Sequence, residues 1–203
     1  MDLIKIWINI NVVRTIPGLI VLAWSPEKTV IKKDISRWIK EKDLETLNYP
    51  AWKYFHYLML YYPEFRNLFY HRLKKINLFL PKVIELFYPS LNTLYIHTKS
   101  IGAGLYIEHG FSTIISAESI GENCWINQQV TIGFSNKSDC PIVGDNVRIA
   151  AGAKVIGKVR IGNNSVVGAN AVVVKDVPDN CTVGGVPASI LRDHIQSPKI
   201  DDL

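Results

Sequence analysis

Cysteine is scarce in this sequence of 203 residues, and its placement forms no pattern. Cys124, Cys140 and Cys181 are odd in number and share no CxxC spacing. A secreted domain held together by disulfides needs an even, closely spaced set, so we expect a protein of a reducing compartment, the cytoplasm. Charged residues are also few, at 20% against 48% hydrophobic residues, which excludes an intrinsically disordered chain.

Long apolar runs and long basic runs are absent as well. The uncharged stretch 15–25 near the N-terminus is much shorter than the roughly 20 residues of a membrane-spanning helix. Contact of this segment with a membrane surface stays open as the less favoured alternative. No basic run exceeds two residues, so the aromatic residues between them predict helix packing, and we expect no nucleic-acid partner.

Glycine is nearly missing from the first part of the chain. Only Gly18 precedes residue 93, whereas 12 glycines follow it. The same boundary separates 16 aromatic residues from 5, and it separates 14 Lys and Arg with 8 Asp and Glu from 9 with 10, a net charge of +6 from −1. This split predicts an α+β protein with an α-helical N-terminal domain over 1–92, a second domain over 93–192 and a tail over 193–203.

Apolar residues in 1–92 recur at helical spacing. Ser25 and Pro26 are typical of a helix start, and the apolar stripe from Val30 to Ile39 leaves lysines on the opposite face. The segments FHYLMLYY (55–62) and FRNLFYHRLKKINLFL (65–80) predict two further helices.

From about residue 95 aliphatic residues recur every six positions. Such a period fits neither a helix nor an ordinary strand, and it is typical of a parallel β-helix, in which short strands form the sides of a prism and each aliphatic side chain points to its axis. The rows are Ile114, Ile120, Ile126 and Ile132, then Val143, Ile149, Val155, Ile161, Val167 and Val173.

Two breaks interrupt this period. The step from Ile107 to Ile114 is seven, so one extra residue is accommodated near 108–110. The step after Ile132 is eleven, so about five residues within 134–141 must leave the prism as a loop. Because loops on a rigid solenoid commonly carry binding residues, both breaks predict the functional site.

Four motifs in 96–192 resemble the serine acetyltransferase branch of the hexapeptide-repeat acyltransferases. They are IHTKSIGAGLYIEHGFSTIIS, INQQVTIG, IAAGAKVIGKVRIGNNSVVGANAVVVKDVP and GGVPASI. IKKDISRWI and FRNLFYHRL resemble the helical N-terminal region of that branch more loosely. The resemblance implies a left-handed β-helix and an acetyl-CoA-dependent O-acetyltransferase that acetylates L-serine for cysteine biosynthesis. It also implies a homotrimer with each active site between neighbouring prisms, and it leaves open a dimer of trimers joined through the N-terminal helices.

Acetyl transfer to an alcohol requires a general base and a hydrogen-bond donor that stabilises the oxyanion. An alcohol attacks a thioester only when a general base takes its proton, and histidine is suited to that role at neutral pH. His109 stands in the place of the family's catalytic histidine, whereas His97 is as readily a structural histidine. Gly133 stands beside the family's thioester, where its backbone N–H would steady the oxyanion.

Further positions match the family's acetyl-CoA site. Ala151 and Ala169 correspond to small residues along the pantetheine arm. Gly185 and Pro187 correspond to the turn near the adenine. Lys175 would neutralise phosphates of the cofactor, although a solvated surface lysine is an equal reading.

Three departures concern the acceptor. The family's orienting carboxylate has no acidic counterpart at Tyr95, or at its neighbours if the match is shifted by one residue. The substrate-binding carboxylate before the histidine is Glu108, one methylene longer. The family's Arg-His pair after the oxyanion glycine is missing, and the shortened loop offers Asp139, which could hydrogen-bond sugar hydroxyls. Arginine is the side chain that grips a carboxylate with two hydrogen bonds, so a sugar or polysaccharide precursor remains an alternative acceptor.

Two other classes of protein share the hexapeptide prism. Carbonic anhydrases with the same prism need three histidine ligands for zinc, and this part of the chain offers at most His97 and His109, so we expect no metal. A noncatalytic β-helix scaffold remains an alternative, but it gives no reason for a histidine at a register break or for a loop beside it.

Overall fold

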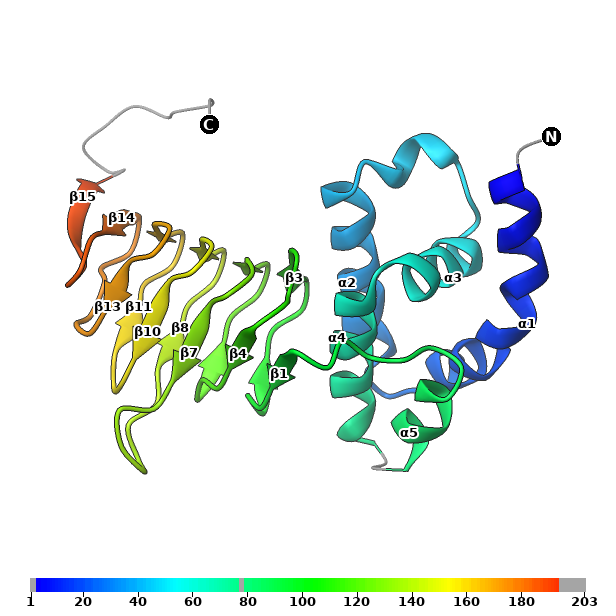
Figure 1. Cartoon of the computed structure of the whole chain (residues 1–203), viewed down its shortest axis with the longest axis horizontal. Coiled ribbons are helices and arrows are strands. Elements are labelled where there is room, and N and C mark those ends of the chain that lie inside the picture. The colour runs from blue at the N-terminus through cyan, green and yellow to red at the C-terminus, as the bar shows by residue number, and fades with distance from the viewer. Residues whose placement is uncertain (1–2, 77–78, 194–203) are drawn as a thin grey trace. The chain divides into compact units, whose positions relative to one another are not determined.

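The computed structural model describes residues 3–76 and 79–193, with the backbone alone for residues 3–10. The chain divides into two compact units, Met1–Asn92 and Thr93–Leu203. The first is helical and the second is a β-solenoid (Figure 1). Of the expected C-terminal tail, only Asp193 lies within the described residues.

Proline marks the start of three helices in the first unit. Pro50 is the N-cap of α3, and Pro63 and Pro81 lie in the first turns of α4 and α5, where a missing N–H costs no helical hydrogen bond. The elements are α1 (Leu3–Trp24), α2 (Lys28–Glu41), the 3-10 helix η1 (Leu44–Leu47), α3 (Ala51–Tyr61), α4 (Pro63–Lys74) and α5 (Leu80–Glu85).

Two helix boundaries differ from the sequence expectation. Helix α2 begins at Lys28 rather than at Pro26, and Ser25 Oγ accepts the N–H of Glu27 at 3.0 Å, so the serine closes the turn before the helix. The segment expected to be one helix over 65–80 ends at Lys74, and α5 begins only at Leu80.

The core of the helical unit is aromatic. The ring of Phe65 lies edge-on to Trp38 at 5.5 Å and to Phe55 at 6.2 Å, and all three side chains are buried. Beside them the guanidinium of Arg72 donates to Asp34 at 3.0 Å within a fully buried ion pair. These contacts confirm that the aromatic residues of this part pack a core.

The second unit winds through three parallel sheets for about five turns. Sheet A contains β1, β4, β7, β10 and β13; sheet B contains β2, β5, β8 and β11; sheet C contains β3, β6, β9, β12 and β14, with β15 antiparallel at its end. The strands are β1 (Leu94–Ile96), β2 (Ser100–Ile101), β3 (Tyr106–Ile107), β4 (Thr113–Ile115), β5 (Ser119–Ile120), β6 (Trp125–Ile126), β7 (Thr131–Gly133), β8 (Ile142–Val143), β9 (Arg148–Ile149), β10 (Lys154–Ile156), β11 (Arg160–Ile161), β12 (Val166–Val167), β13 (Val172–Val173), β14 (Cys181–Gly184) and β15 (Ser189–Asp193).

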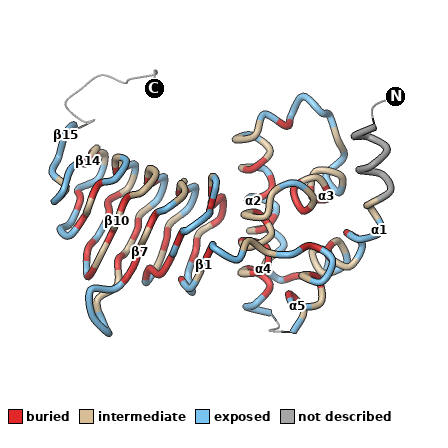
Figure 2. Tube along the Cα trace, in the orientation of Figure 1, coloured by how far each residue is buried: buried red, intermediate tan, exposed pale blue. Residues whose placement is uncertain are grey.

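The aliphatic rows fill the axis of the prism with one exception (Figure 2). Nine of the ten predicted row residues are at most 2% exposed. The expectation for Ile114 was wrong: it is 40% exposed, and Ile115 is buried in its place. The step from Ile107 is therefore eight, because the corner widens at His109 and Ser112, which both have positive φ. A shift by one residue exchanges the two faces of a strand.

Glycine and asparagine build the sharp corner between sheets B and C. A Cβ added at Gly102 would lie 2.5 Å from the carbonyl carbon of Gly121, so the stacked backbones leave no room for a side chain. Asn146, Asn164 and Asn180 take positive φ angles, and their side chains form a ladder of hydrogen bonds of 3.0 Å. Asparagine tolerates this conformation better than most residues, which accounts for its recurrence.

Candidate functional site

Two neighbouring corners of the prism carry the residues that the sequence singles out. The C/A corner leads from sheet C to sheet A and consists of residues 108–112, 127–130, 150–153 and 168–171. The A/B corner leads from sheet A to sheet B and consists of residues 97–99, 116–118, 134–141, 157–159 and 174–176. The width of sheet A separates them, so residues of different corners do not meet within one prism.

His109 lies on the C/A corner with its side chain exposed. Its φ of 51° is a left-handed conformation that non-glycine residues seldom adopt, and its carbonyl accepts the N–H of Phe111 at 2.6 Å. No described side chain hydrogen-bonds the imidazole. The corner thus presents the histidine to solvent on a constrained backbone, the kind of feature that is common at functional sites.

Glu108 precedes His109 and is held by a neighbour on the next coil. Asn127 Nδ2 donates to Glu108 Oε2 at 3.3 Å. Sequence reasoning missed Asn127. In the structure Ile107 pairs with Ile126 on the next coil, and this pairing places the following residues, Glu108 and Asn127, side by side. A carboxylate positioned beside an exposed histidine can bind a cationic or hydroxylated substrate.

The predicted cofactor residues Ala151 and Ala169 lie on the same corner as His109, on later coils. The N–H of Asn170 donates to the carbonyl of Ala151 at 2.9 Å, which places the two alanines at equivalent positions one coil apart. Ala169 is exposed and Ala151 is partly exposed. Small side chains along this corner leave room for a long ligand parallel to the prism axis.

Gly185 continues this line at the next coil. Its carbonyl accepts the N–H of Val172 at 3.0 Å, and its φ of 95° suits glycine. Pro187 follows on the same exposed turn. The C/A corner therefore brings together His109, Glu108, both alanines and the C-terminal turn.

Gly133 lies on the other side of sheet A, at the end of β7. Its backbone pairs with Ile156 of β10. A Cβ added there would meet only Thr131 Cγ2, at 3.9 Å, so open space lies beside this glycine. Nothing in the packing of the prism requires glycine at this position. Gly133 is buried as a whole, so this space lies only on the side where a side chain would project.

The predicted loop leaves the prism directly after Gly133 and returns at β8. Its Asp139 carboxylate accepts hydrogen bonds from Asn136 Nδ2 at 2.6 Å and from Ser135 Oγ at 3.2 Å. Asp139 therefore braces the loop from within. A substrate hydroxyl that binds Asp139 would have to share this carboxylate with the loop.

Cys140 anchors the end of the loop to the preceding coil. Its Sγ donates to the carbonyl of Ser116 at 3.2 Å. Burial, and then the charge of Glu118, raise the pKa of the Cys140 thiol, which keeps it protonated at neutral pH and able to donate. This contact could not be predicted from the local sequence, because 24 residues separate the two partners.

His97 occupies the A/B corner above Ser116. Its Nδ1 lies 3.2 Å from Ser116 Oγ, and its ring centroid lies 6.2 Å from that of Tyr95. Strand pairing continues this line to Gly133. Tyr95 is thus a neighbour of His97, across sheet A from His109. Lys175 is exposed on the same A/B corner, at the coil after β13.

Neither a metal centre nor a membrane span is found in residues 3–76 and 79–193. No three His, Cys, Asp or Glu side chains in this part are arranged to hold a metal ion. No helix there combines the length and the apolar character needed to cross a bilayer.

Comparison with known proteins places this geometry in a known context. The family model "Bacterial transferase hexapeptide (six repeats)" matches residues 140–175. A serine acetyltransferase of Synechococcus elongatus is 34% identical over 161 residues, which are 70% of this chain and 66% of that protein. A serine acetyltransferase of Staphylococcus aureus strain Mu50 is 45% identical over 96 residues, 45% of each chain. This chain thus spans between about half and two thirds of the length of these relatives.

A solved structure shows the same architecture. A serine acetyltransferase in complex with CoA superposes with a TM-score of 0.58 at 29% identity, covering 80% of this chain and 69% of that one. The similarity therefore extends beyond the hexapeptide repeats into the helical unit.

Proposed function

We propose that this chain, which belongs to the serine acetyltransferase branch of the hexapeptide-repeat acyltransferases, transfers the acetyl group of acetyl-CoA to the hydroxyl of L-serine. The observation that carries the proposal is the C/A corner. It presents an exposed histidine on a constrained turn, a carboxylate next to it and a line of small residues on the following coils. L-serine is the proposed acceptor because the relatives are named serine acetyltransferases.

His109 is the general base of the proposed reaction. Its imidazole takes the proton of the serine hydroxyl while the oxygen attacks the thioester carbonyl. The tetrahedral intermediate then collapses, the C–S bond breaks and the thiolate of CoA leaves, taking the proton back from the imidazolium. Glu108, held by Asn127, would bind the ammonium group of serine.

Acetyl-CoA would lie along the C/A corner. Ala151 and Ala169 leave space for the pantetheine arm, and Gly185 with Pro187 would meet the adenine end. Lys175 would neutralise a phosphate from the facing corner. The CoA complex of a structural neighbour supports this choice of cosubstrate.

Each active site would form between two chains of a trimer. Gly133 and the loop 134–141 lie on the A/B corner, whereas His109 lies on the C/A corner, with sheet A between them. A threefold arrangement in which the sheets A face the axis brings the C/A corner of one prism against the A/B corner of the next. Exposed Tyr95 and Ile114 on the outer face of sheet A support its burial in such an interface. The Gly133 N–H of one chain would then steady the oxyanion formed beside His109 of another.

We expect the reaction to occur in the cytoplasm. No disulfide joins the three cysteines, all of which lie in the described part of the chain, and Cys140 uses its thiol as a hydrogen-bond donor, so a reducing environment suits this fold.

A sugar hydroxyl is the second candidate acceptor. The loop offers Asp139 and Cys140 but no arginine to pair with the carboxylate of an amino acid. An acceptor without a carboxylate would not need one.

A thiol-release assay distinguishes the two acceptors. Purified protein is mixed with acetyl-CoA and, in turn, L-serine, homoserine or amino sugars, and free CoA is followed. Release that depends on L-serine supports the proposal. Release with a sugar alone would move the assignment to the second candidate, and no release with any acceptor would overturn both.

A further inference from the structure

Helix α1 exposes an apolar stripe that the helical unit does not cover. Val13, Ile16, Ile20 and Trp24 are 70%, 44%, 56% and 87% exposed. Their spacing of three or four residues places them on one face of the helix. Contiguous apolar surface of this kind on a folded unit commonly marks an interaction site.

The opposite face of α1 is firmly packed. Thr15 Oγ1 hydrogen-bonds His56 Nδ1 at 2.5 Å and the Tyr88 hydroxyl at 2.6 Å, and all three side chains are buried. A Cβ at Gly18 would lie 3.2 Å from the Phe55 ring. The stripe is therefore the outer face of a docked helix, not a core face that lacks its partner.

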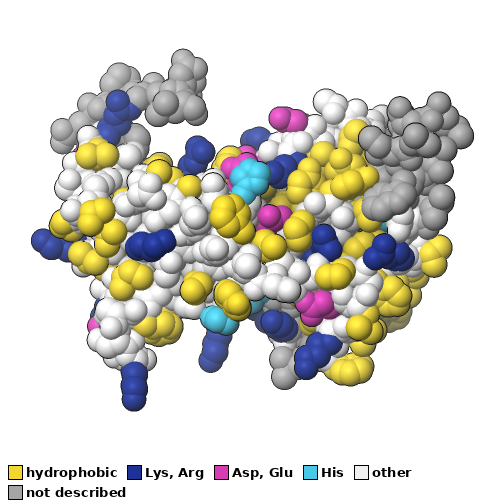
Figure 3. All heavy atoms as spheres, viewed as in Figure 1, with side chains coloured by type: hydrophobic (Ala, Val, Ile, Leu, Met, Phe, Trp, Pro, Cys, Tyr) yellow, Lys and Arg dark blue, Asp and Glu magenta, His cyan; other side chains and the backbone are white. Residues whose placement is uncertain are grey.

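Basic residues outnumber acidic ones in the segment that carries the stripe and the start of α2. Between residues 11 and 33 there are four Lys and Arg, and Glu27, the one acidic residue there, lies 3.6 Å from Lys75. Figure 3 shows hydrophobic side chains at the surface of the helical unit, with Lys and Arg side chains and a few Asp and Glu side chains among them. Within this segment the charge is thus almost all of one sign.

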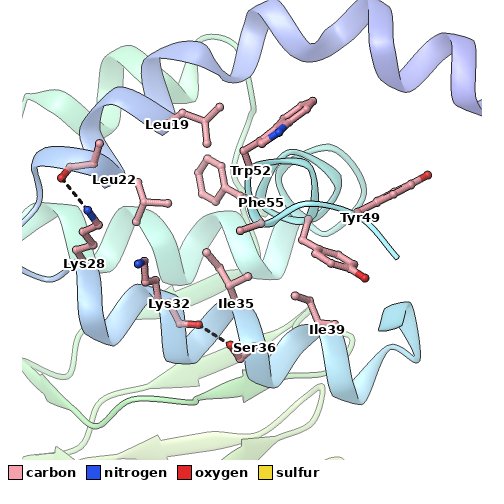
Figure 4. Close-up of a pocket in the computed structure, with 13 residues that line it drawn as sticks. Leu19, Leu22, Lys28, Lys32, Ile35, Ser36, Ile39, Tyr49, Trp52 and Phe55 are labelled. Carbon is pink, nitrogen blue, oxygen red and sulfur yellow. Dashed lines mark hydrogen bonds between the residues drawn. The ribbon is translucent and has the colours of Figure 1, made fainter. Parts of the chain in front are cut away.

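A groove of about 590 Å³ lies between α1, α2 and α3, and it too is lined by apolar side chains and lysines. Its lining includes Leu19, Leu22 and Ile35, and Lys28 and Lys32 stand at one end (Figure 4). The lining contains no carboxylate. Apolar surface and lysines therefore occur side by side along both α1 and the adjoining face of α2.

We infer that this surface docks the protein on a bilayer that contains anionic phospholipid. The apolar stripe would enter the boundary between headgroups and acyl chains, with Trp24 at the depth where tryptophan is enriched. Lys28 and Lys32 would lie over the phosphates, where each basic residue strengthens attachment. A second copy of this chain fits less well, because a twofold interface pairs this surface with itself, and the groove lining offers lysines but no carboxylate to meet them.

Flotation of the full-length protein with vesicles tests this inference. Phosphatidylcholine vesicles with and without phosphatidylglycerol are compared at low and high salt. We expect flotation with phosphatidylglycerol only, weakened by salt. No flotation with anionic vesicles, or equal flotation with both kinds, would overturn the inference.

A matched pair of variants shows whether the stripe is responsible. Ile20→Asn should lower the partition coefficient at least tenfold, whereas Ile190→Asn, at an equally exposed position of β15 (56% and 55%), should leave it unchanged. The double variant Lys28→Gln/Lys32→Gln should lose about fivefold for each lysine. Circular dichroism confirms that each variant is folded.

Sedimentation without vesicles tests the alternative that a second copy of this chain covers the stripe. If Ile20→Asn reduces the size of the assembly while flotation of the unmodified protein is absent, a second copy covers the stripe and the inference is wrong. This test does not depend on acetyl transfer, so its failure would not contradict the proposed reaction.

Discussion

The variant Gly133→Ala, which adds one methyl group, should lower activity without lowering the stability of the fold. Because an added Cβ meets only Thr131, at 3.9 Å, we expect Gly133→Ala to unfold at the same temperature as the unmodified protein. The methyl group would occupy the space proposed for the thioester, so kcat/KM should fall at least tenfold. Thermal unfolding and thiol release measure the two effects.

Gly102→Ala is the control for this variant. Its Cβ would lie 2.5 Å from the backbone of Gly121, so it should destabilise the fold by about 1–3 kcal/mol or more. If Gly133→Ala unfolds as early as Gly102→Ala, the glycine has a structural role and the prediction fails.

Ala169 offers a test of the proposed cofactor path. Its side chain is exposed, so Ala169→Leu should fold normally, but the larger side chain would obstruct the pantetheine arm. We expect the KM for acetyl-CoA to rise at least tenfold with a smaller change in kcat at saturation. Ser100→Leu, at an exposed position of sheet B, is the control. An unchanged KM in Ala169→Leu would place the cofactor elsewhere.

Among the helices, a buried ion pair joins α2 to α4. Asp34→Asn leaves the fully buried guanidinium of Arg72 without its countercharge, which should cost about 3–5 kcal/mol of unfolding free energy. Glu41→Gln removes the more accessible pair with Arg37, one turn apart on α2, and should cost about 0.3–0.5 kcal/mol. Urea denaturation compares them, and equal losses would contradict this account.

The strands show how far the hexapeptide period predicts structure. It predicted the buried row and the position of the loop because an inward side chain every six residues is a property of the local sequence. It failed at Ile114, which keeps the six-residue step to Ile120, because the widened corner at His109 and Ser112 places the adjacent isoleucine on the axis instead.

The candidate site was predictable only in part. His109 and Gly133 follow from the register breaks and the resemblance. The contacts of Asn127 with Glu108 and of Cys140 with Ser116 join different coils. They therefore depend on how the chain winds and not on residues adjacent in the sequence.

For the whole molecule, the proposed trimer makes a distinctive prediction. If His109 and Gly133 of different chains form one site, then His109→Ala and Gly133→Val should each be inactive but should complement each other in mixed trimers. Random mixing gives a quarter of the sites both intact residues, so we expect about a quarter of the normal activity. Co-expression with two affinity tags provides the mixed trimers. Absence of any recovery would contradict a site shared between chains.

The most direct test of acetyl transfer by this corner is the turnover rate of His109→Ala beside that of His97→Ala, measured by thiol release with saturating acetyl-CoA and acceptor. Loss of the general base should lower kcat by about 10²–10⁴-fold in His109→Ala. His97 contacts Ser116 on the other corner, and its loss should cost less than about tenfold, below the range of a general base. A His109→Ala protein that keeps its turnover, or a larger loss in His97→Ala, would contradict the central claim.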